Sequence, residues 1–431
     1  MKKRVLIIEP AFSATGYGEN ARFVLRSLRQ HEDKLELFLV PTRWGMGGEI
    51  TTHDEEYLWM QSLVRKQEEY LATEGQKFDA SVQVDVPTGF QRLSPLDIGV
   101  TAGIEADKMV PEWANAIQKM DKVVTPSEFA KNVIVDTKFA VHDNFLNKTV
   151  GEHGIDVTKT PVEVVHYPVK LIQPEPLELK LSTTFNLLTC VQWGPRKAAH
   201  LTIDAFYRAF RNDPNAGLIV KTFGINGSKL DRERTMNAVK NTVEHFRGKD
   251  GAKCKVYLLH GNLSEGQMTT LYRMVDGYVT TTHGEGFGLP IFEAAYNECP
   301  VIATDWSGHL DFLCVDESVN KYGKETPGKK RKMFLPVQYA LGEVPPEQVA
   351  EKMFRSDTKW AYVNPNSVVT RMKDLKKDPN RFKSQAIKLA TYLKSNFNQK
   401  KQYDLMANAL LGDYLNMSDW LSELNKEIET V

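Results

Sequence analysis

Two glutamates enclose a glycine-rich turn in the segment HGEGFGLPIFEAAYNECPVIATDWSG, which spans residues 283–308. Seven residues separate Glu285 from Glu293, and two of the seven are glycines. Paired carboxylates could be the acid and nucleophile of a glycosidase, whose carboxyl groups lie about 5–9.5 Å apart across the scissile bond. They could instead make two separate hydroxyl contacts with one extended ligand. A surface turn with two solvated glutamates is the third interpretation.

The helix start that follows favours the extended ligand. Pro290 suits the first position of a helix, because the N–H group that proline lacks has no partner there. The free N–H groups of Phe287, Gly288 and Leu289 can bind a phosphate together with the helix dipole, and glycines allow a ligand to approach the backbone. A phosphate site between the carboxylates fits a glycosidase poorly. It fits a nucleotide sugar, with one carboxylate on the ribose and the other on the sugar.

Strand-like and helix-like segments alternate along the whole chain. We expect strands at residues 5–8, 35–40, 80–84, 98–101, 123–125, 185–191, 217–221, 256–259 and 278–281. We expect helices at residues 21–28, 55–71, 201–210, 232–246 and 264–274, one beginning at Glu128, and a last one near 410–421. This βα repeat predicts α/β domains with mostly parallel sheets and helices on both faces.

The pattern breaks near residues 168–182, where three prolines interrupt it. We predict two doubly wound, Rossmann-like domains that face a central cleft, where the carboxyl ends of the strands bind ligands. The predicted boundaries are 1–168 for the first domain, 169–181 for a linker, 182–400 for the second domain, and 401–431 for a helical segment that can pack back on the first domain.

Composition sets limits on location and partners. The chain has 431 residues and a formal net charge of zero, so no global field attracts nucleic acid or a membrane. The start, MKKRVLIIEP, has only four consecutive apolar residues before Glu9, which is too short for a signal peptide or a membrane span. The four cysteines have no CxxC spacing and are expected to be reduced, buried thiols. We therefore predict a cytoplasmic protein.

The quoted segment resembles the motif of retaining glycosyltransferases of family 4, which have the GT-B fold. Their pattern is E-G-F-G-L-P-x-x-E, then an alanine-rich helix, a Pro-Val strand and a glycine. LTCVQWG and PRKAAHLTIDAFYRAF resemble the strand and the lysine-containing phosphate segment of the same family. In the first half, GYGENAR and IEADKMVPEWANAIQKMDKVVTPSEFAK resemble the donor-facing glycine loop and a recurrent P-W and D-x-V-x-x-P-S stretch.

The resemblance implies a role for each matching residue. Glu293 would bind the ribose and Glu285 the transferred sugar. Arg196 and Lys197 would neutralise the diphosphate, with Lys221 as a weaker candidate. The remaining expected contacts are Glu105 toward the acceptor, Gly16, Tyr17 and Gly18 toward the donor, and Asn262 and Leu263 at the nucleobase.

Two departures and one absence qualify the resemblance. Many members have an arginine five residues before the lysine, where this chain has Gln192, and a histidine after the strand that leads to Glu105, where this chain reads VTAGIE. No DxD motif is present. The family generally works without a bound metal, so the resemblance implies no cofactor beyond the nucleotide sugar, a UDP-sugar, as co-substrate.

The acceptor is the open part of the prediction. The run from SATGYGENARFVLRSLR to TAGIEADKMVPEW resembles glycosyltransferases of tailed bacteriophages, some of which modify hydroxylated pyrimidines in DNA, and this would place the protein in the host cytoplasm. Two basic segments could contact duplex DNA, one at residues 371–401 and one formed by Lys329, Lys330, Arg331 and Lys332. The alternatives are solvated surface at both segments, a polysaccharide or lipid acceptor, and a non-catalytic sugar-nucleotide or nucleic-acid binding module.

Overall fold

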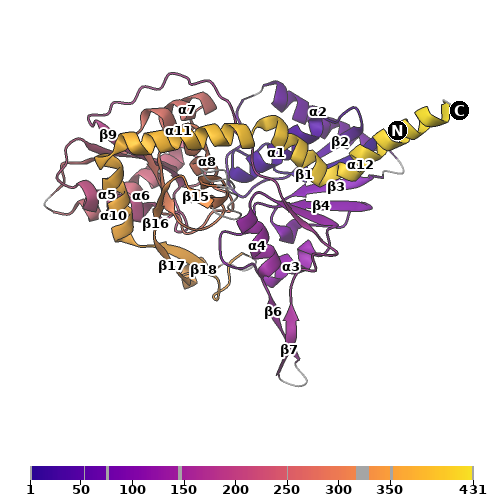
Figure 1. Ribbon diagram of the computed structural model, residues 1–431, viewed down its shortest axis with the longest axis horizontal. Coiled ribbons are helices and arrows are strands. Elements are labelled where there is room, and N and C mark those ends of the chain that lie inside the picture. Colours follow the sequence, from indigo (N-terminus) through magenta and orange to yellow (C-terminus); the bar gives the residue numbers. More distant parts are fainter. Residues whose placement is uncertain are drawn as a thin grey trace, which may run out of the picture.

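The computed structural model describes residues 2–52, 54–73, 77–143, 148–249, 251–316, 330–349 and 353–429. Two six-stranded parallel sheets, each covered by helices, form two domains that lie side by side (Figure 1). The predicted α/β class with two Rossmann-like domains is confirmed. None of the helices in the described residues combines the length and the apolar character needed to cross a bilayer.

The first sheet has the strand order β2-β1-β3-β4-β5-β8. Its strands are β1 (Lys3–Glu9), β2 (Leu35–Pro41), β3 (Ala80–Val84), β4 (Leu96–Val100), β5 (Lys122–Thr125) and β8 (Val162–Val164). Its helices are α1 (Gly16–Arg29), α2 (Glu55–Leu71), α3 (Pro111–Ile117) and α4 (Glu128–Asp136), with a 3₁₀ turn η1 (Pro87–Gly89). A hairpin of β6 (Phe139–Asp143) and β7 (Lys148–His153) projects from this domain (Figure 1).

Helix α1 begins earlier than expected. The sequence suggested a loop up to residue 20 and a helix over 21–28, whereas α1 starts at Gly16. The side chain of Thr15 accepts a hydrogen bond from the N–H of Gly18, and this N-cap satisfies one of the free donors of the first turn. The glycines here are therefore the first turn of a helix rather than a loop.

The second sheet has the strand order β11-β10-β9-β12-β13-β16. Its strands are β9 (Phe185–Gln192), β10 (Ala216–Phe223), β11 (Lys255–Leu259), β12 (Gly277–Val279), β13 (Val301–Thr304) and β16 (Leu335–Val337). The helices of this domain are α5 (Ala199–Phe210), α6 (Lys229–Arg247), α7 (Glu265–Met274), α8 (Leu289–Tyr296), α9 (Leu310–Leu313), α10 (Pro365–Lys377) and α11 (Pro379–Asn396). Two short antiparallel pairs join β14 (Cys314–Asp316) to β15 (Lys330–Lys332) and β17 (Tyr339–Glu343) to β18 (Lys359–Val363), and η2 (Pro346–Gln348) lies between β17 and β18.

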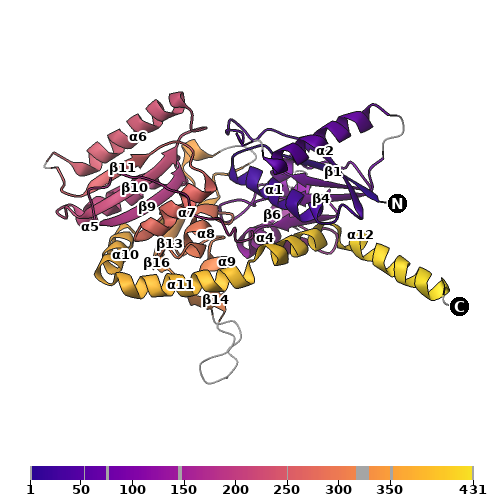
Figure 2. The same cartoon turned by 90° about the horizontal axis from the view of Figure 1, so that it is seen from above.

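The C-terminal helix α12 (Gln399–Glu429) returns to the first domain, where it packs against α1 (Figure 2). The ring centroids of Tyr403 and Phe23 lie 5.8 Å apart, and the hydroxyl of Tyr414 donates to the backbone oxygen of Asp79 at 3.1 Å. Lys34 donates to the backbone oxygen of Leu415 at 3.1 Å. The last helix thus ties the second domain to the first.

Aromatic side chains join the two domains near the predicted site. Tyr167, which follows the first sheet, packs against Phe23 of α1 and against Phe287, at centroid distances of 5.7 and 5.0 Å. Phe287 continues the cluster to Phe292 and Phe312 of the second domain. These rings are buried, so the start of α8 is held rigidly against the first domain.

Candidate functional site

The glycines of the central motif allow the two domains to meet closely. A Cβ atom on Gly284 would lie 2.4 Å from the backbone oxygen of Glu105, and one on Gly286 would lie 2.2 Å from that of Ala102. Both neighbours follow β4 of the first domain. We expected these glycines to admit a ligand to the backbone, but at these two positions the approaching group is the other domain. The carboxyl ends of the two sheets therefore face each other.

Helix α8 begins with free backbone donors. Gly288, at φ +96°, is its N-cap, so Leu289 rather than Pro290 occupies the first helical position. Within the described residues, the N–H groups of Phe287, Gly288 and Leu289 donate to no other group. The Phe287 side chain is buried in the aromatic cluster, so only its backbone could meet a ligand. Such a helix start is suited to an anion.

Four charged residues from three segments meet in front of this helix. The Lys197 Nζ atom lies 2.6 Å from both carboxylate oxygens of Glu285. Arg196 reaches three groups: its Nη1 lies 2.6 Å from the backbone oxygen of Gly284 and 3.7 Å from Glu285 Oε2, and its Nη2 lies 3.0 Å from Glu105 Oε1. The Arg196–Glu105 ion pair crosses from the second domain to the first. The structure thus brings together all four residues predicted to be catalytic.

The electrostatic environment keeps Glu285 ionised. Burial acts to raise the pKa of Glu285, but the charges of Lys197 and Arg196 outweigh it, and the pKa falls below its ordinary value. The pKa of Lys197 is also lowered, first by burial and then by the neighbouring Arg196, while Glu285 opposes the change. The contacts of 2.6 Å between Lys197 Nζ and both oxygens of Glu285 place a carboxylate against an ammonium group.

Glu293 lies in a different environment, one turn inside α8. Its Oε2 atom accepts a hydrogen bond from the hydroxyl of Tyr272 at 2.9 Å. Burial raises the pKa of Glu293 to about 7, and the Tyr272 hydrogen bond and the charge of Lys170 offset only part of this rise. Glu293 is therefore a hydrogen-bonding group that can carry its proton near neutral pH.

Sequence reasoning missed several residues of this site. Tyr272 lies on α7 and has no motif of its own. Ser307 accepts a hydrogen bond from the N–H of Glu285 at 3.0 Å, and its φ of +85° is unusual for a residue with a side chain. Cys190, which we expected only as a buried thiol, lies at the end of β9 within electrostatic range of Lys221, Glu293 and Lys197. The WSG run after β13 was the available signal for Ser307.

The first turn of α1 contributes a packed aromatic wall. Tyr17 stacks on Trp44 with centroids 3.7 Å apart, and its hydroxyl lies 3.1 Å from Thr101 Oγ1 and accepts from the N–H of Ala102 at 3.3 Å. Tyr17 thus supports the segment that carries Glu105. A Cβ atom on Gly18 would lie 1.9 Å from the backbone oxygen of Ser13 within the same domain. No atom comes within 4 Å of a Cβ built on Gly16, so space at that position is open.

Lys221 and the two residues predicted to contact the nucleobase, Asn262 and Leu263, lie at the ends of β10 and β11. Lys221 is buried, and its Nζ donates to the backbone oxygen of Gly261 at 3.1 Å. This hydrogen bond holds the turn that leads to Asn262. The Asn262 side chain is exposed, and Leu263 is partly buried against the core. Lys221 is separate from the Lys197–Glu285 pair.

A cavity of about 510 Å³ lies beside the first domain's strand ends, next to the Trp44 loop. It is lined by Phe12, Pro41, Thr42, Arg43, Glu49, Tyr57, Gln61, Val64 and Arg65. The rings of Phe12 and Tyr57 meet edge to face at 5.2 Å. The cavity therefore combines aromatic surface with two arginines, one glutamate and the polar side chains of Thr42, Tyr57 and Gln61.

Histidines near the strand ends are engaged in packing or polar contacts. His283 stacks on Trp360 and its Nδ1 lies 2.8 Å from the backbone oxygen of Ala361. His166 Nδ1 lies 2.9 Å from the backbone oxygen of Pro126. Across the part of the chain that the structure describes, no group of three or more His, Cys, Asp or Glu side chains is placed to hold a metal ion.

A comparison of the sequence with protein families identifies one match. Residues 187–323 match the family model described as "Glycosyl transferases group 1". The match covers about a third of the chain and includes Arg196, Lys197 and the whole Glu285–Glu293 motif. No curated protein sequence matches the chain.

Solved structures share the architecture over nearly the whole chain. The chain resembles Anabaena HepE in complex with UDP and glucose, with a TM-score of 0.57 and 13% identity over 95% of this chain and 99% of that one. It also resembles sucrose-phosphate synthase from Thermosynechococcus elongatus, with a TM-score of 0.56 and 13% identity over 99% and 100% of the two chains. A glycosyltransferase from Rickettsia africae ESF-5 gives a TM-score of 0.54 and 12% identity over 95% and 99%. The chain therefore has the GT-B fold.

Proposed function

We propose that this protein is a glycosyltransferase that moves a sugar from a nucleotide diphosphate donor to an acceptor hydroxyl. The observation that carries the proposal is the cluster of Arg196, Lys197 and Glu285 in front of the free N–H groups of α8. A segment that matches a glycosyl transferase family model contains this cluster. The Anabaena HepE structures, which contain UDP, support a UDP-sugar as the donor.

The contacts of the cluster suggest how the donor would bind. The diphosphate would lie between the start of α8 and the two cations, which are now paired with carboxylates. Glu293 would accept hydrogen bonds from the ribose, and Glu285 would contact the transferred sugar. Asn262 and Leu263 would lie at the nucleobase. Because the cations are already held in place, their reorganisation on donor binding would be small.

We further propose that the reaction retains the anomeric configuration, as in glycosyltransferases of family 4. Departure of the diphosphate is the demanding step, and Arg196, Lys197 and the α8 donors would stabilise its developing charge. The acceptor hydroxyl would then attack from the face that the leaving group has just vacated, and the leaving phosphate would take its proton. The Arg196–Glu105 pair would hold the domains together and limit access of water.

For the acceptor we propose a hydroxylated pyrimidine in DNA, as in enzymes of tailed bacteriophages that act in the host cytoplasm. The supporting observation is the cavity beside β1 and β2, which offers rings of Phe12 and Tyr57 for a base, polar groups for its edge, and Arg43 and Arg65 for flanking phosphates. A base must leave the duplex to enter such a pocket. A polysaccharide or lipid acceptor is the alternative substrate class.

One experiment tests the reaction and the acceptor together. A panel of nucleotide sugars is offered with duplex DNA that carries 5-hydroxymethylpyrimidines, and in parallel with glycan and lipid acceptors. Mass spectrometry identifies the product, and the anomeric proton coupling in NMR gives its configuration. Transfer to DNA with retention is the expected result. Transfer only to a glycan or lipid would refute the DNA acceptor, and binding without transfer or donor hydrolysis would indicate a non-catalytic module.

A further inference from the structure

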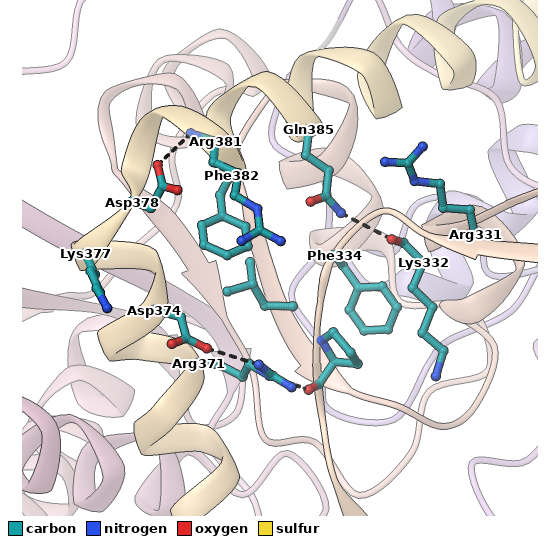
Figure 3. A pocket seen from close by; sticks show the side chains of 12 residues that line it. Arg331, Lys332, Phe334, Arg371, Asp374, Lys377, Asp378, Arg381, Phe382 and Gln385 are labelled. Carbon is teal, nitrogen blue, oxygen red and sulfur yellow. Dashed lines mark hydrogen bonds and ion pairs between the residues drawn. The ribbon is translucent and has the colours of Figure 1, made fainter. Parts of the chain in front are cut away.

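A second cavity, of about 700 Å³, lies in the second domain and shares no lining residue with the site described above (Figure 3). We call it the α10–α11 pocket. Its lining residues are Arg331, Lys332, Phe334, Leu335, Pro336, Arg371, Asp374, Lys377, Asp378, Arg381, Phe382 and Gln385. They come from β15 and β16 on one side and from α10 and α11 on the other.

The hollow lies where the expected basic segment, residues 371–401, is broken between α10 and α11. Residues 371–401 were expected as one run, but α10 ends at Lys377 and α11 begins at Pro379. Asp378, which precedes the proline, leaves the helical conformation at φ −138° and ψ 64°, as steric contact with a following proline favours. The bend between the helices opens toward the β15–β16 segment.

The pocket concentrates positive charge in a chain whose formal net charge is zero. Five of its lining residues are cationic and two are acidic. Asp378 caps α11 by accepting from the N–H of Arg381 at 3.3 Å, and Asp374 accepts from Arg371 at 3.0 Å. Both carboxylates are therefore engaged within the two helices, and the remaining charge facing the pocket is positive.

Two of the cations hold the wall and two are available to a ligand. Lys332 is paired with Asp305, and Arg371 donates to the backbone oxygen of Pro336 at 3.0 Å. Lys377 and Arg381 are exposed, and among the described residues neither side chain forms an ion pair. The Arg381 guanidinium lies 5.2 Å from the centroid of the Phe382 ring, which leaves its N–H groups at the rim.

The arrangement of the cations favours a ligand with several anionic groups. Figure 3 shows Arg331, Lys332 and the phenyl ring of Phe334 on one side of the pocket, and Lys377, Arg381 and the phenyl ring of Phe382 on the other. A single small anion could meet only one side. Successive phosphates, with a sugar and base over the apolar floor, could meet both.

Further cations continue the charge beyond the pocket along both helices. Lys373 lies four residues before Lys377 on α10, and Lys388 lies seven residues after Arg381 on α11, so each shares a helix face with its partner. Lys330 of β15 is exposed beside Arg331. Such a track exceeds what a free nucleotide needs and suits a polymer.

We propose that the α10–α11 pocket binds the phosphodiester backbone of the nucleic-acid acceptor. This inference rests on the proposed function and joins its two predicted DNA contacts, residues 371–401 and the run 329–332, into one site. Lys329 of that run lies outside the described residues. Here Arg331 would act together with Lys377 and Arg381, which are remote from it in sequence but line the same cavity, while Lys332 holds the wall through its pair with Asp305. The pocket would hold the DNA backbone outside the donor site and would not take part in the reaction.

The test compares the full-length wild type with the double variant Lys377→Gln/Arg381→Gln. Binding of a fluorescently labelled duplex that carries 5-hydroxymethylpyrimidines is measured by anisotropy over a series of salt concentrations. Each lost phosphate contact should reduce the slope of log affinity against log salt by about 0.9, so a loss of about 1–2 is expected. Lys377→Arg/Arg381→Lys should keep the wild-type slope.

Matched controls separate a local effect from loss of charge. Lys159→Gln/Lys240→Gln removes the same charge from two exposed positions, one before β8 in the first domain and one on α6, and should leave the slope unchanged. An equal loss in both double variants would overturn the proposal. The proposal would also be overturned if the wild type showed no salt-dependent DNA binding, or if inorganic tripolyphosphate bound the pocket but the duplex did not.

Donor hydrolysis is measured in the same variants as an independent readout. It should be unchanged in Lys377→Gln/Arg381→Gln, because neither residue belongs to the donor site. Absence of hydrolysis and transfer in the wild type would refute the proposed function. An active wild type whose salt dependence of DNA binding is unchanged by Lys377→Gln/Arg381→Gln would refute only the pocket.

Discussion

Glu285 and Glu293 belong to one motif, yet the structure gives them opposite environments. Glu285 lies against Lys197 and Arg196, and its pKa is lowered although it is buried. Glu293 lies against the Tyr272 hydroxyl, and burial raises its pKa to about 7. The same side chain is therefore held as a carboxylate at one end of the motif and close to its protonated form at the other.

The difference between the two glutamates shows that their spacing in the sequence does not by itself determine what each carboxylate does. The cations beside Glu285 come from the loop after β9, and Arg196 also reaches Glu105 in the first domain. The partner of Glu293 comes from α7. Each environment is assembled from remote segments, so the two glutamates should respond differently to the same substitution.

The largest effect should follow removal of the cation beside Glu285. Lys197→Met is expected to lower kcat/KM by about 10²–10³-fold, because a preorganised partner for developing negative charge is lost. Initial rates of sugar transfer measure the effect. Lys240→Met, an exposed lysine on α6, is the control. If Lys197→Met kept near-wild-type activity, Lys197 would not belong to the phosphate site. The charges around Glu285 would then have no role in catalysis.

The two glutamates should separate in steady-state kinetics. Glu293→Gln is expected to raise KM for the donor by about tenfold with little change in kcat, because a ribose contact is equal in the ground and transition states. Glu285→Gln is expected to lower kcat more than it changes KM. Exposed Glu233 on α6 provides the control Glu233→Gln. Equal effects of the two motif variants on kcat and KM would contradict the division of tasks.

A smaller effect is expected in the pH dependence of stability. Between pH 4.5 and about 7, the folded state binds more protons at Glu293 than the unfolded state does, so this contribution is complete below about pH 4.5 and is lost as the pH rises toward 7. The rise of the Glu293 pKa from 4.5 to about 7 corresponds to about 3 kcal/mol of unfolding free energy. Because the Glu293 side chain keeps some contact with solvent, which screens its charge, we expect a measured contribution on the order of 1 kcal/mol.

Urea unfolding of the wild type and of Glu293→Gln across this range measures the contribution. Glutamine cannot titrate, so the variant should lack the loss of unfolding free energy toward pH 7 that the wild type shows. The pKa values of His283 and His309 are lowered, mainly by burial, and their contribution is common to both proteins, so the difference between the two curves isolates Glu293. Parallel curves would show that Glu293 is already ionised well below pH 7.

Much of the fold was predictable because its determinants are local. Strand β3 was expected at residues 80–84 and is found there, since its sequence ASVQV alternates apolar and polar residues with the period of a strand. The hairpins β6–β7 and β17–β18 were missed. Strand β7 is largely polar and β17 is largely exposed, so neither shows an apolar pattern that would pair it with the short apolar runs of β6 and β18. Helix α1 began five residues early because the capping contact of Thr15 was not recognised.

The sequence by itself determined the strand–helix alternation, a helix start near Pro290 and the residue types of the site, since apolar periodicity and the backbone preferences of glycine and proline act over a few residues. Only the tertiary structure decided which charges meet. Glu105 reaches Arg196 across the domain interface, and Arg331 shares a pocket with Arg381. It also decided the pKa of each glutamate, because burial and neighbouring charge depend on chain segments that the motif does not contain.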